Sequence, residues 1–268
     1  MFDGILVQVL SIGSLALLFG GLLGFSAKKF AVRLDPRVEK ITGVLPSVNC
    51  GGCGFAGCAQ FADAVVKGDA TYKGCPVGGA SVAGQIAEIM GVDPVAADKK
   101  VAFVKCNGID ANVKFNYSYD GPRSCIAASQ LATGGNKSCT YGCLGLSSCK
   151  NICPFDAIKM VDGIAVVDSK KCTACGKCVG VCPRSLIEIV SEKDTVRVAC
   201  SSRDSGKTVR ENCRSGCIGC SLCQKVCESE AIKVENNIAK VNYEKCTHCL
   251  VCVGKCPVKA IKTTELRA

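Results

Sequence analysis

The chain is 268 residues long and contains 24 cysteines, 29 glycines, nine phenylalanines, five tyrosines and no tryptophan. So few aromatic side chains argue against one large apolar core and favour small modules. Many of the cysteines fall in C-x2-C groups, and several precede proline, which favours metal ligation over the disulfide scaffold of a secreted protein. The formal charge of +10 suggests nucleic-acid binding as an alternative. However, no aromatic-studded basic stripe accompanies this charge.

The first elongated feature is an apolar stretch. Residues 5–27 read ILVQVLSIGSLALLFGGLLGFSA, without a charged side chain. At about 1.5 Å per residue, this length crosses a bilayer core of about 30 Å. A signal peptide is the alternative, but it needs a basic leader, and only Asp3 precedes the stretch. We therefore expect residues 1–27 to form a retained transmembrane anchor, with 5–27 in the lipid bilayer.

The residues after this stretch predict its orientation. No basic side chain precedes the stretch and five follow it: Lys28, Lys29, Arg33, Arg37 and Lys40. The positive-inside rule then places everything after residue 27 in the cytoplasm, with 28–45 as a basic juxtamembrane linker. Within the stretch, Ala16, Gly20 and Gly24 recur at every fourth position. This spacing favours close approach of another helix, although glycine is also simply common in membrane spans.

The first cysteine group has the spacing C-x2-C-x4-C-x16-C within residues 46–92. Because all four ligands are local, we expect a separate small 4Fe–4S domain held by Cys50, Cys53, Cys58 and Cys75. The apolar spacing predicts helices over 59–66 and 80–90, the second ending near Gly91. Zinc is the alternative occupant, but zinc ribbons usually pair two C-x2-C knuckles.

Two later motifs have the C-x2-C-x2-C-x3-C-P spacing of bacterial ferredoxins, in which the fourth cysteine ligates the neighbouring cluster. They begin at Cys172 and Cys246, and we call the interval between these two cysteines the repeat offset. This offset predicts a duplicated two-cluster unit, first over 139–190 and then over 214–268, with connecting segments at 93–138 and 191–213. Each unit also predicts a β-hairpin, which turns at 162–163 in the first unit and at 236–237 in the second.

Crossed ligation between the two halves of a unit predicts three regular clusters. The first unit is expected to hold one on Cys153, Cys172, Cys175 and Cys178. The second unit is expected to hold one on Cys217, Cys220, Cys223 and Cys256, and another on Cys246, Cys249, Cys252 and Cys227. Glu228 follows Cys227 where the motif has proline, a departure that leaves the ligand in place.

The remaining site of the first unit is irregular, because Leu146 stands where the middle cysteine of the motif belongs. Cys139 lies shortly upstream and can replace that cysteine. We therefore expect a cluster on Cys139, Cys143, Cys149 and Cys182. A three-iron centre or a lost cluster is the alternative.

Four cysteines are left over after these assignments: Cys106, Cys125, Cys200 and Cys213. Residues 104–106 resemble residues 198–200, and each segment is followed by a lone cysteine ahead of a ferredoxin motif. We expect these four to hold a sixth cluster between the two units; free or structural cysteines are the alternative. A rival register also exists, because Cys139 and Cys213 are separated by the repeat offset, so Cys213 could instead serve within the second unit.

Little else in the chain suggests chemistry. His248 lies between Cys246 and Cys249, but enough cysteines are available there, so we expect it to tune the potential or to face solvent. No triad, carboxylate pair, phosphate loop or GxGxxG motif stands out, so we expect no catalytic residue and no direct NAD binding. Six oxidised clusters at about −2 each would bring the loaded protein to a charge of about −2. The basic excess is thus better explained by cluster charge than by nucleic acid.

The predicted fold class is α+β: an N-terminal transmembrane helix, a small helical 4Fe–4S domain and two tandem bacterial-type two-cluster ferredoxin units. Folding is expected to depend on the clusters, as in other small metallodomains. Many clusters in one small chain indicate an electron wire rather than a complete active site.

This order of parts, an apolar anchor, a C-G-G-C-G-x3-C-x16-C-P domain and tandem ferredoxin motifs, resembles the B subunit of the Rnf complex in its cluster-rich clostridial form. The likeness covers essentially the whole chain. It implies a subunit of an ion-translocating ferredoxin:NAD oxidoreductase that takes electrons from reduced soluble ferredoxin and passes them to membrane-embedded subunits. Ion pumping and the flavin and nicotinamide chemistry would belong to those partners. Local basic patches would steer an acidic ferredoxin.

Two other interpretations stay open at this point. One is an iron–sulfur electron-transfer subunit of another membrane-bound complex, such as a hydrogenase. The other is a non-redox scaffold in which the metal is purely structural.

Overall fold

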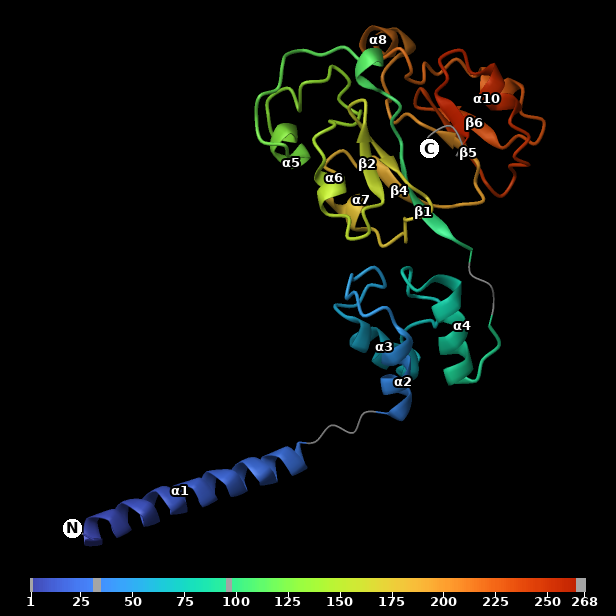
Figure 1. The fold of residues 1–268 in the computed structure, drawn as a ribbon. Coiled ribbons are helices and arrows are strands. Elements are labelled where there is room, and N and C mark those ends of the chain that lie inside the picture. Colours follow the sequence, from blue (N-terminus) through green and yellow to red (C-terminus); the bar gives the residue numbers. More distant parts are fainter. Residues whose placement is uncertain (1, 31–34, 95–97, 264–268) are drawn as a thin grey trace.

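The computed structural model describes residues 2–30, 35–94 and 98–263. Figure 1 shows three successive parts: a long N-terminal helix, a small helical domain, and a larger body of short strands and helices. This mixture of helices and strands agrees with the predicted α+β class.

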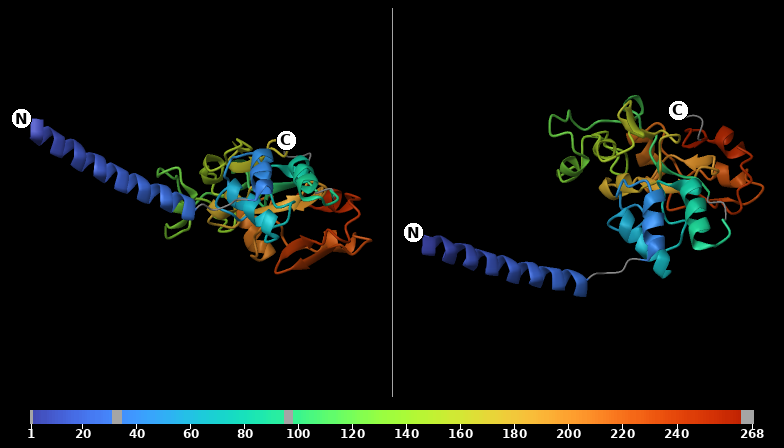
Figure 2. Two further views of the ribbon diagram at one scale, coloured as in Figure 1. Left: turned by 90° about the horizontal axis from the view of Figure 1, so that it is seen from below. Right: turned by 60° about the horizontal axis from the view of Figure 1, so that its bottom comes forward.

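The N-terminal helix α1 spans Phe2–Lys29 and extends away from the other elements in Figures 1 and 2. Its segment Ile12–Lys29 is long and apolar enough to cross a membrane, and none of that segment is buried within the protein. Large apolar side chains such as Leu17 and Phe25 are exposed. Lipid is the surrounding that such a helix surface fits, so α1 is a candidate membrane span.

The small helical domain contains three helices: α2 (Pro36–Val44), α3 (Cys58–Lys67) and α4 (Gly79–Met90). The last two match the helices predicted over 59–66 and 80–90. Their apolar faces meet in a core that includes Phe61 and Ile86, both fully buried. Left-handed glycines, Gly68 and Gly91, end α3 and α4.

Helix α2 lies inside the range that the sequence suggests is a basic linker. Pro36 starts the helix, and the Asp35 side chain accepts a hydrogen bond from the Arg37 backbone N–H, a combination that favours helix initiation. Val38 and Ile41 are buried in the core of the small domain. The basic residues of this segment therefore sit on a helix that belongs to the domain, and not on an extended tether.

The larger body is built from two-stranded antiparallel sheets, four of them in the described residues. In the first repeat, residues 100–191, β1 (Lys100–Val104) pairs with β4 (Ile187–Ser191), and β2 (Ile158–Val161) pairs with β3 (Ile164–Val167). In the second repeat, residues 196–263, β5 (Val196–Val198) pairs with β8 (Ile261–Thr263), and β6 (Ile232–Glu235) pairs with β7 (Ile238–Val241).

The strand registers show that the two repeats share one architecture. In the hairpins, Ile158 faces Val167 and, one repeat offset later, Ile232 faces Val241. The outer pairs also correspond, because Ile187 faces Val104 and Ile261 faces Val198. The duplication therefore includes β1 and β5, which lie in the segments that the sequence suggests are connections.

Short helices complete each repeat. The first contains the 3-10 helix η1 (Asp110–Asn112), α5 (Cys125–Ser129), α6 (Ser148–Asn151) and α7 (Lys177–Val181), and the second contains α8 (Gly206–Asn212), α9 (Leu222–Lys225) and α10 (Val251–Lys255). Cys106 and Cys139 are much farther apart in the sequence than their counterparts Cys200 and Cys213. The first repeat therefore carries an insertion, and α5 lies within it.

Gly145 lies where a cysteine loop meets the hairpin turn of the first repeat. Its φ is +78°, and a Cβ at this position would lie 2.5 Å from the Gly163 carbonyl oxygen. Gly219 has the equivalent place in the second repeat, where a Cβ would lie 3.1 Å from the Asn237 carbonyl oxygen. Only glycine avoids both the left-handed strain and the collision with backbone.

Replacing Gly145 with alanine is expected to destabilise the cluster-loaded protein by roughly 2–5 kcal/mol, because left-handed strain and overpacking add. Anaerobic thermal unfolding followed by circular dichroism measures the loss. Gly91→Ala is the matched control, since Gly91 has a φ of +68° but open space around its Cα. Equal losses in the two variants would show that the contact with Gly163 does not matter.

Candidate iron–sulfur centres

The small helical domain gathers four cysteines around one cavity of about 320 Å³: Cys50, Cys53, Cys58 and Cys75. Asn49 fixes the loop before α3, because its side-chain oxygen accepts a hydrogen bond from the Cys58 N–H at 2.8 Å. The Gly78 N–H points at the Cys75 sulfur at 3.3 Å. Backbone N–H donors of this kind favour the thiolate form that iron requires.

The three regular sets are each brought together in the repeats. Cavities of about 330 Å³ are lined in one case by Cys153, Cys172, Cys175 and Cys178, and in another by Cys217, Cys220, Cys223 and Cys256. Burial raises the pKa of Cys252 to about 11, and the nearby thiols of Cys246, Cys249 and Cys227 raise it further. These are the groupings that crossed ligation predicts.

The irregular set differs from the prediction. A cavity of about 370 Å³ is lined by Cys125, Cys143, Cys149 and Cys182. Cys139, which the sequence suggests as the fourth member, is not among its lining residues and faces another cavity. Cys125 therefore takes the place of the cysteine that Leu146 replaces.

The insertion explains how Cys125 reaches this position. Ser124 caps α5, so Cys125 stands at the start of the helix, and its N–H donates a hydrogen bond to the Ser148 side chain at 2.8 Å. Cys125 also packs with Leu144 and Leu146 in a small apolar cluster. Leu146 thus lies against the segment that supplies the missing thiol, a relation between distant residues that spacing alone does not reveal.

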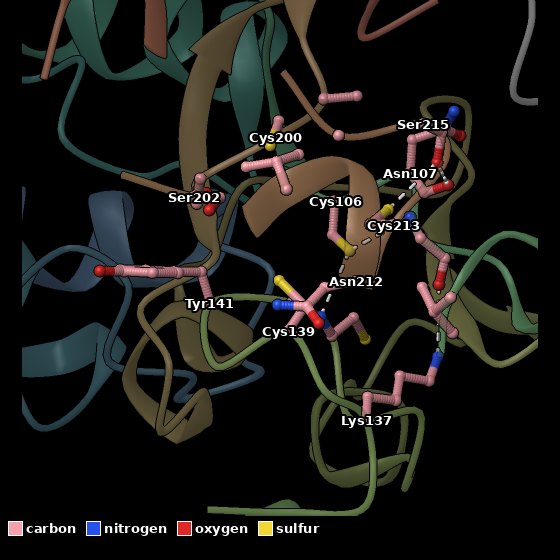
Figure 3. Close-up of a pocket in the computed structure, with 18 of the residues that line it drawn as sticks. Cys106, Asn107, Lys137, Cys139, Tyr141, Cys200, Ser202, Asn212, Cys213 and Ser215 are labelled. Carbon is pink, nitrogen blue, oxygen red and sulfur yellow. Dashed lines mark hydrogen bonds between the residues drawn. The ribbon is translucent and has the colours of Figure 1, made fainter. Parts of the chain in front are cut away.

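The largest cavity lies between the two repeats (Figure 3), and four thiols surround its approximately 490 Å³: Cys106, Cys139, Cys200 and Cys213. The Gly108 N–H lies 3.4 Å from the Cys106 sulfur and the Cys143 N–H lies 3.3 Å from it, so backbone donors also point at this sulfur. The expected quartet between the repeats is therefore present, but with Cys139 in place of Cys125.

The duplication accounts for this exchange. Cys106 and Cys200 closely follow β1 and β5, and Cys139 and Cys213 are separated by the repeat offset. Each repeat therefore contributes the same two cysteines to the cavity between them. The repeat offset is the sequence signal that identifies Cys139 as the partner of Cys213.

The chemistry of the thiols tests whether these sites fit iron–sulfur clusters. Burial raises the pKa of Cys149 to about 12 and those of Cys178, Cys200 and Cys223 to about 11. In the described residues, no three Cys, His, Asp or Glu side chains converge closely enough to hold a single metal ion. Zinc would require thiolates about 2.3 Å from one point. Thiols spread around a cavity of several hundred Å³ fit a multi-atom cluster instead.

His248 stays outside the ligand sets. Its Nδ1 lies 3.2 Å from the Thr195 hydroxyl, and four cysteines are grouped around the neighbouring centre without it. The imidazole therefore contacts the start of the second repeat and not a ligand cavity.

The quartets follow one another without a break. A Cβ on Gly52 of the small domain would lie 3.0 Å from the Cys175 carbonyl oxygen, so the two backbones touch. Cys178 is close enough to Cys149 to raise its pKa, although burial raises it more. Cys143 lines both the Cys125 cavity and the cavity between the repeats.

The series continues into the second repeat. The Cys217 backbone hydrogen-bonds to the Cys200 thiol, which links the cavity between the repeats to the next centre. Both remaining quartets lie in a single core there, with Cys217, Cys223 and Cys252 among its buried members. The centres therefore form one line from the small domain to the end of the chain.

Arg184 adds positive charge beside the two centres that differ from expectation. Its guanidinium donates hydrogen bonds to the carbonyl oxygens of Cys139 at 2.8 Å and Gly142 at 2.5 Å. In the part of the chain that the structure describes, no carboxylate pairs with it, whereas nearby Lys137 pairs with Asp110 at 3.0 Å. The equivalent position in the second repeat is Val258, so this cation is confined to the first repeat.

Three family models match parts of the chain. An Fe-S cluster family covers residues 45–77, an LdpA Fe-S cluster-binding domain covers 139–193, and a 4Fe-4S dicluster domain covers 216–260. Each match falls on one of the cysteine groups described above.

Whole-length relatives are also found, and each is the B subunit of a membrane complex. The chain is 47% identical, over 97% of its length, to that of the Na(+)-translocating ferredoxin:NAD(+) oxidoreductase complex of Acetobacterium woodii, of which it covers 78%. It is 40% identical, over 91% of its length, to that of the ion-translocating oxidoreductase complex of Methanosarcina acetivorans, of which it covers 92%. It is 42% identical, over 96% of its length, to that of the proton-translocating ferredoxin:NAD(+) oxidoreductase complex of Clostridium ljungdahlii, of which it covers 91%.

Fold and site together define an iron–sulfur protein with several centres and one candidate membrane span. With such similarity over nearly the whole chain, it belongs to the family of B subunits of ion-translocating oxidoreductase (Rnf) complexes. The resemblance inferred from the order of motifs is thereby confirmed.

Serine variants can separate the two quartets that differ from expectation. Cys106→Ser, Cys125→Ser and Cys139→Ser are each expected to remove about four irons, one cluster. The double variant Cys106→Ser/Cys139→Ser should lose no more than either single variant, because both thiols face one cavity. Cys106→Ser/Cys125→Ser should lose about eight. Anaerobic iron analysis measures these values, and the reverse pattern would restore the grouping that spacing suggests.

Replacing Arg184 with methionine is expected to make the reduction potentials of the two adjacent clusters more negative, because a cation that favours electron uptake is removed. Redox titration followed by electron paramagnetic resonance measures the change, with iron content as the check on folding. Val258→Met is the matched control in the second repeat and should shift neither potential. A shift of equal size in both variants would contradict a role for the charge.

Proposed function

We propose that this chain is the iron–sulfur electron-transfer subunit of an ion-translocating ferredoxin:NAD oxidoreductase complex. In this proposal it accepts electrons from reduced soluble ferredoxin and passes them to membrane-embedded redox subunits. The observation that carries the proposal is the unbroken series of thiol quartets from the small domain to the second repeat. The names of the relatives, which are subunits of such complexes, support the same assignment.

Six 4Fe–4S clusters are the cofactors in this proposal, arranged in the small domain and in two ferredoxin-like repeats. The residues that would hold the cluster at the irregular site are Cys125, Cys143, Cys149 and Cys182, and those between the repeats are Cys106, Cys139, Cys200 and Cys213. When bound, such clusters take up and release electrons at low potential. The chain's own part is to hold them in line, to shield them from water and to place charge beside them.

The anchor gives this line a direction. The small domain follows α1 directly in sequence, so it is the part of the chain tied most closely to the candidate membrane span. The basic residues after α1 favour a cytoplasmic position for all the centres. Reduced cysteines and a soluble donor both belong on that side. Electrons would therefore enter at the repeats and leave through the small domain toward membrane-embedded partners.

The amount of iron and its response to reductant test the proposal against a purely structural metal. Anaerobically purified full-length protein is expected to contain about 24 irons and to bleach when dithionite is added, as six functional cubanes require. Visible absorption and iron analysis measure both properties. Iron that resists reduction would support a scaffold, and co-purification with hydrogenase subunits would assign the chain to another complex.

A further inference from the structure

The two repeats present the same ligand loop under different cover. Cys175 in the first repeat and Cys249 in the second are separated by the repeat offset and occupy the same motif position. The small domain presses on the first loop, since a Cβ on Gly52 would lie 3.0 Å from the Cys175 carbonyl oxygen and 3.1 Å from its Cα. Cys175 is accordingly half-buried, whereas Cys249 is exposed. One loop thus receives a neighbouring cluster domain, and its copy is left open.

Exposure of this kind is rare among the ligands. Of the 24 cysteines, all within the described residues, only Cys220 and Cys249 are exposed. Cys220 corresponds to Leu146, which the α5 insertion covers in the first repeat. An electron donor in solution needs a centre near the surface, and both exposed cysteines lie in the second repeat. Entry at this repeat is therefore favoured over entry at the first.

The open loop has the composition of a contact surface. Leu250 and Val251 are 42% and 45% exposed, where the first repeat has Gly176 and Lys177. Lys245 and Lys255 flank these residues in sequence and are exposed. An apolar centre with a charged rim is the usual anatomy of a small protein interface, and electron-transfer interfaces are among the smallest.

The surrounding charge indicates the sign of the partner. Residues 196–263 contain twelve lysines and arginines against six aspartates and glutamates. Two oxidised clusters at about −2 each leave this repeat with a positive balance. Such a field accelerates encounter with an acidic protein and repels a basic one.

We infer that the surface formed by Lys245, Cys249, Leu250, Val251 and Lys255, the Cys249 face, is where a soluble acidic ferredoxin docks. The ferredoxin would occupy on the second repeat the place that the Gly52 loop occupies on the first. This inference rests on the proposed function, because it assigns the donor of that function to one surface.

The test follows electron transfer from a reduced, acidic two-cluster bacterial ferredoxin to the anaerobic full-length holoprotein by stopped-flow absorption. Lys245→Glu is expected to lower the second-order rate on the order of fivefold at low salt and to weaken its salt dependence. Lys171→Glu is the matched control, since Lys171 precedes Cys172 as Lys245 precedes Cys246, and both lysines are exposed. It should change the rate by less than about twofold, because a distant rim charge is largely screened.

A second pair of variants tests the apolar centre. Leu250→Asn keeps a residue that accepts the observed φ of +62° and is expected to slow transfer with an unchanged iron content. Leu222→Gln, next to the other exposed cysteine, should not. If Leu222→Gln or Lys171→Glu slows transfer and the Cys249-face variants do not, the inference is overturned.

Other occupants of the surface would give distinct results. A dimer that Leu250→Asn dissociates, or membrane subunits that this variant fails to retain, would assign the Cys249 face to a second copy or to the complex and overturn the inference. If the unaltered holoprotein itself takes no electrons from ferredoxin, the donor in the proposed function fails as well. If it is reduced at the same rate in every variant, only the docking surface fails.

Discussion

The burial of sulfur is the constraint on which the rest of this structure depends. Thiols such as Cys149, with a pKa raised to about 12, do not ionise in water at neutral pH, and iron must displace their protons. The cores of both repeats count cysteines among their main members, and their strands are three to five residues long. Elements this short do not stand alone. The free energy of cluster binding is thus also free energy of folding.

Local features of this kind follow closely from sequence. The hairpins turn where Asp162-Gly163 and Asn236-Asn237 predict, because left-handed turn residues fix the register over a few positions. The helices at α3 and α4 and the three regular cysteine sets likewise depend on spacings within one motif. The family itself is recognisable from the order of these motifs, which the relatives share over nearly their whole length.

Long-range features required the structure. Cys125 and Cys139 exchange places relative to the expected sets, because the choice between them depends on how the α5 insertion folds back on Leu146. Helix α2 escaped notice since its basic surface resembles a linker while only Val38 and Ile41 face inward. In both cases the decisive contact joins residues far apart in sequence, and a single chain without aligned relatives gives no direct sign of it. Only the repeat offset between Cys139 and Cys213 hinted at the result.

The contact at Gly52 shows how the small domain is joined to the first repeat. Two backbones meet there with no side chain between them, so the separation of the flanking centres is set by the thickness of the peptide chain itself. Tunnelling between redox centres weakens steeply as the gap widens. The junction therefore acts as a spacer of fixed width. A bulkier residue at this position would be felt first as slower electron passage toward the membrane, even in a protein that still folds and still binds all its iron.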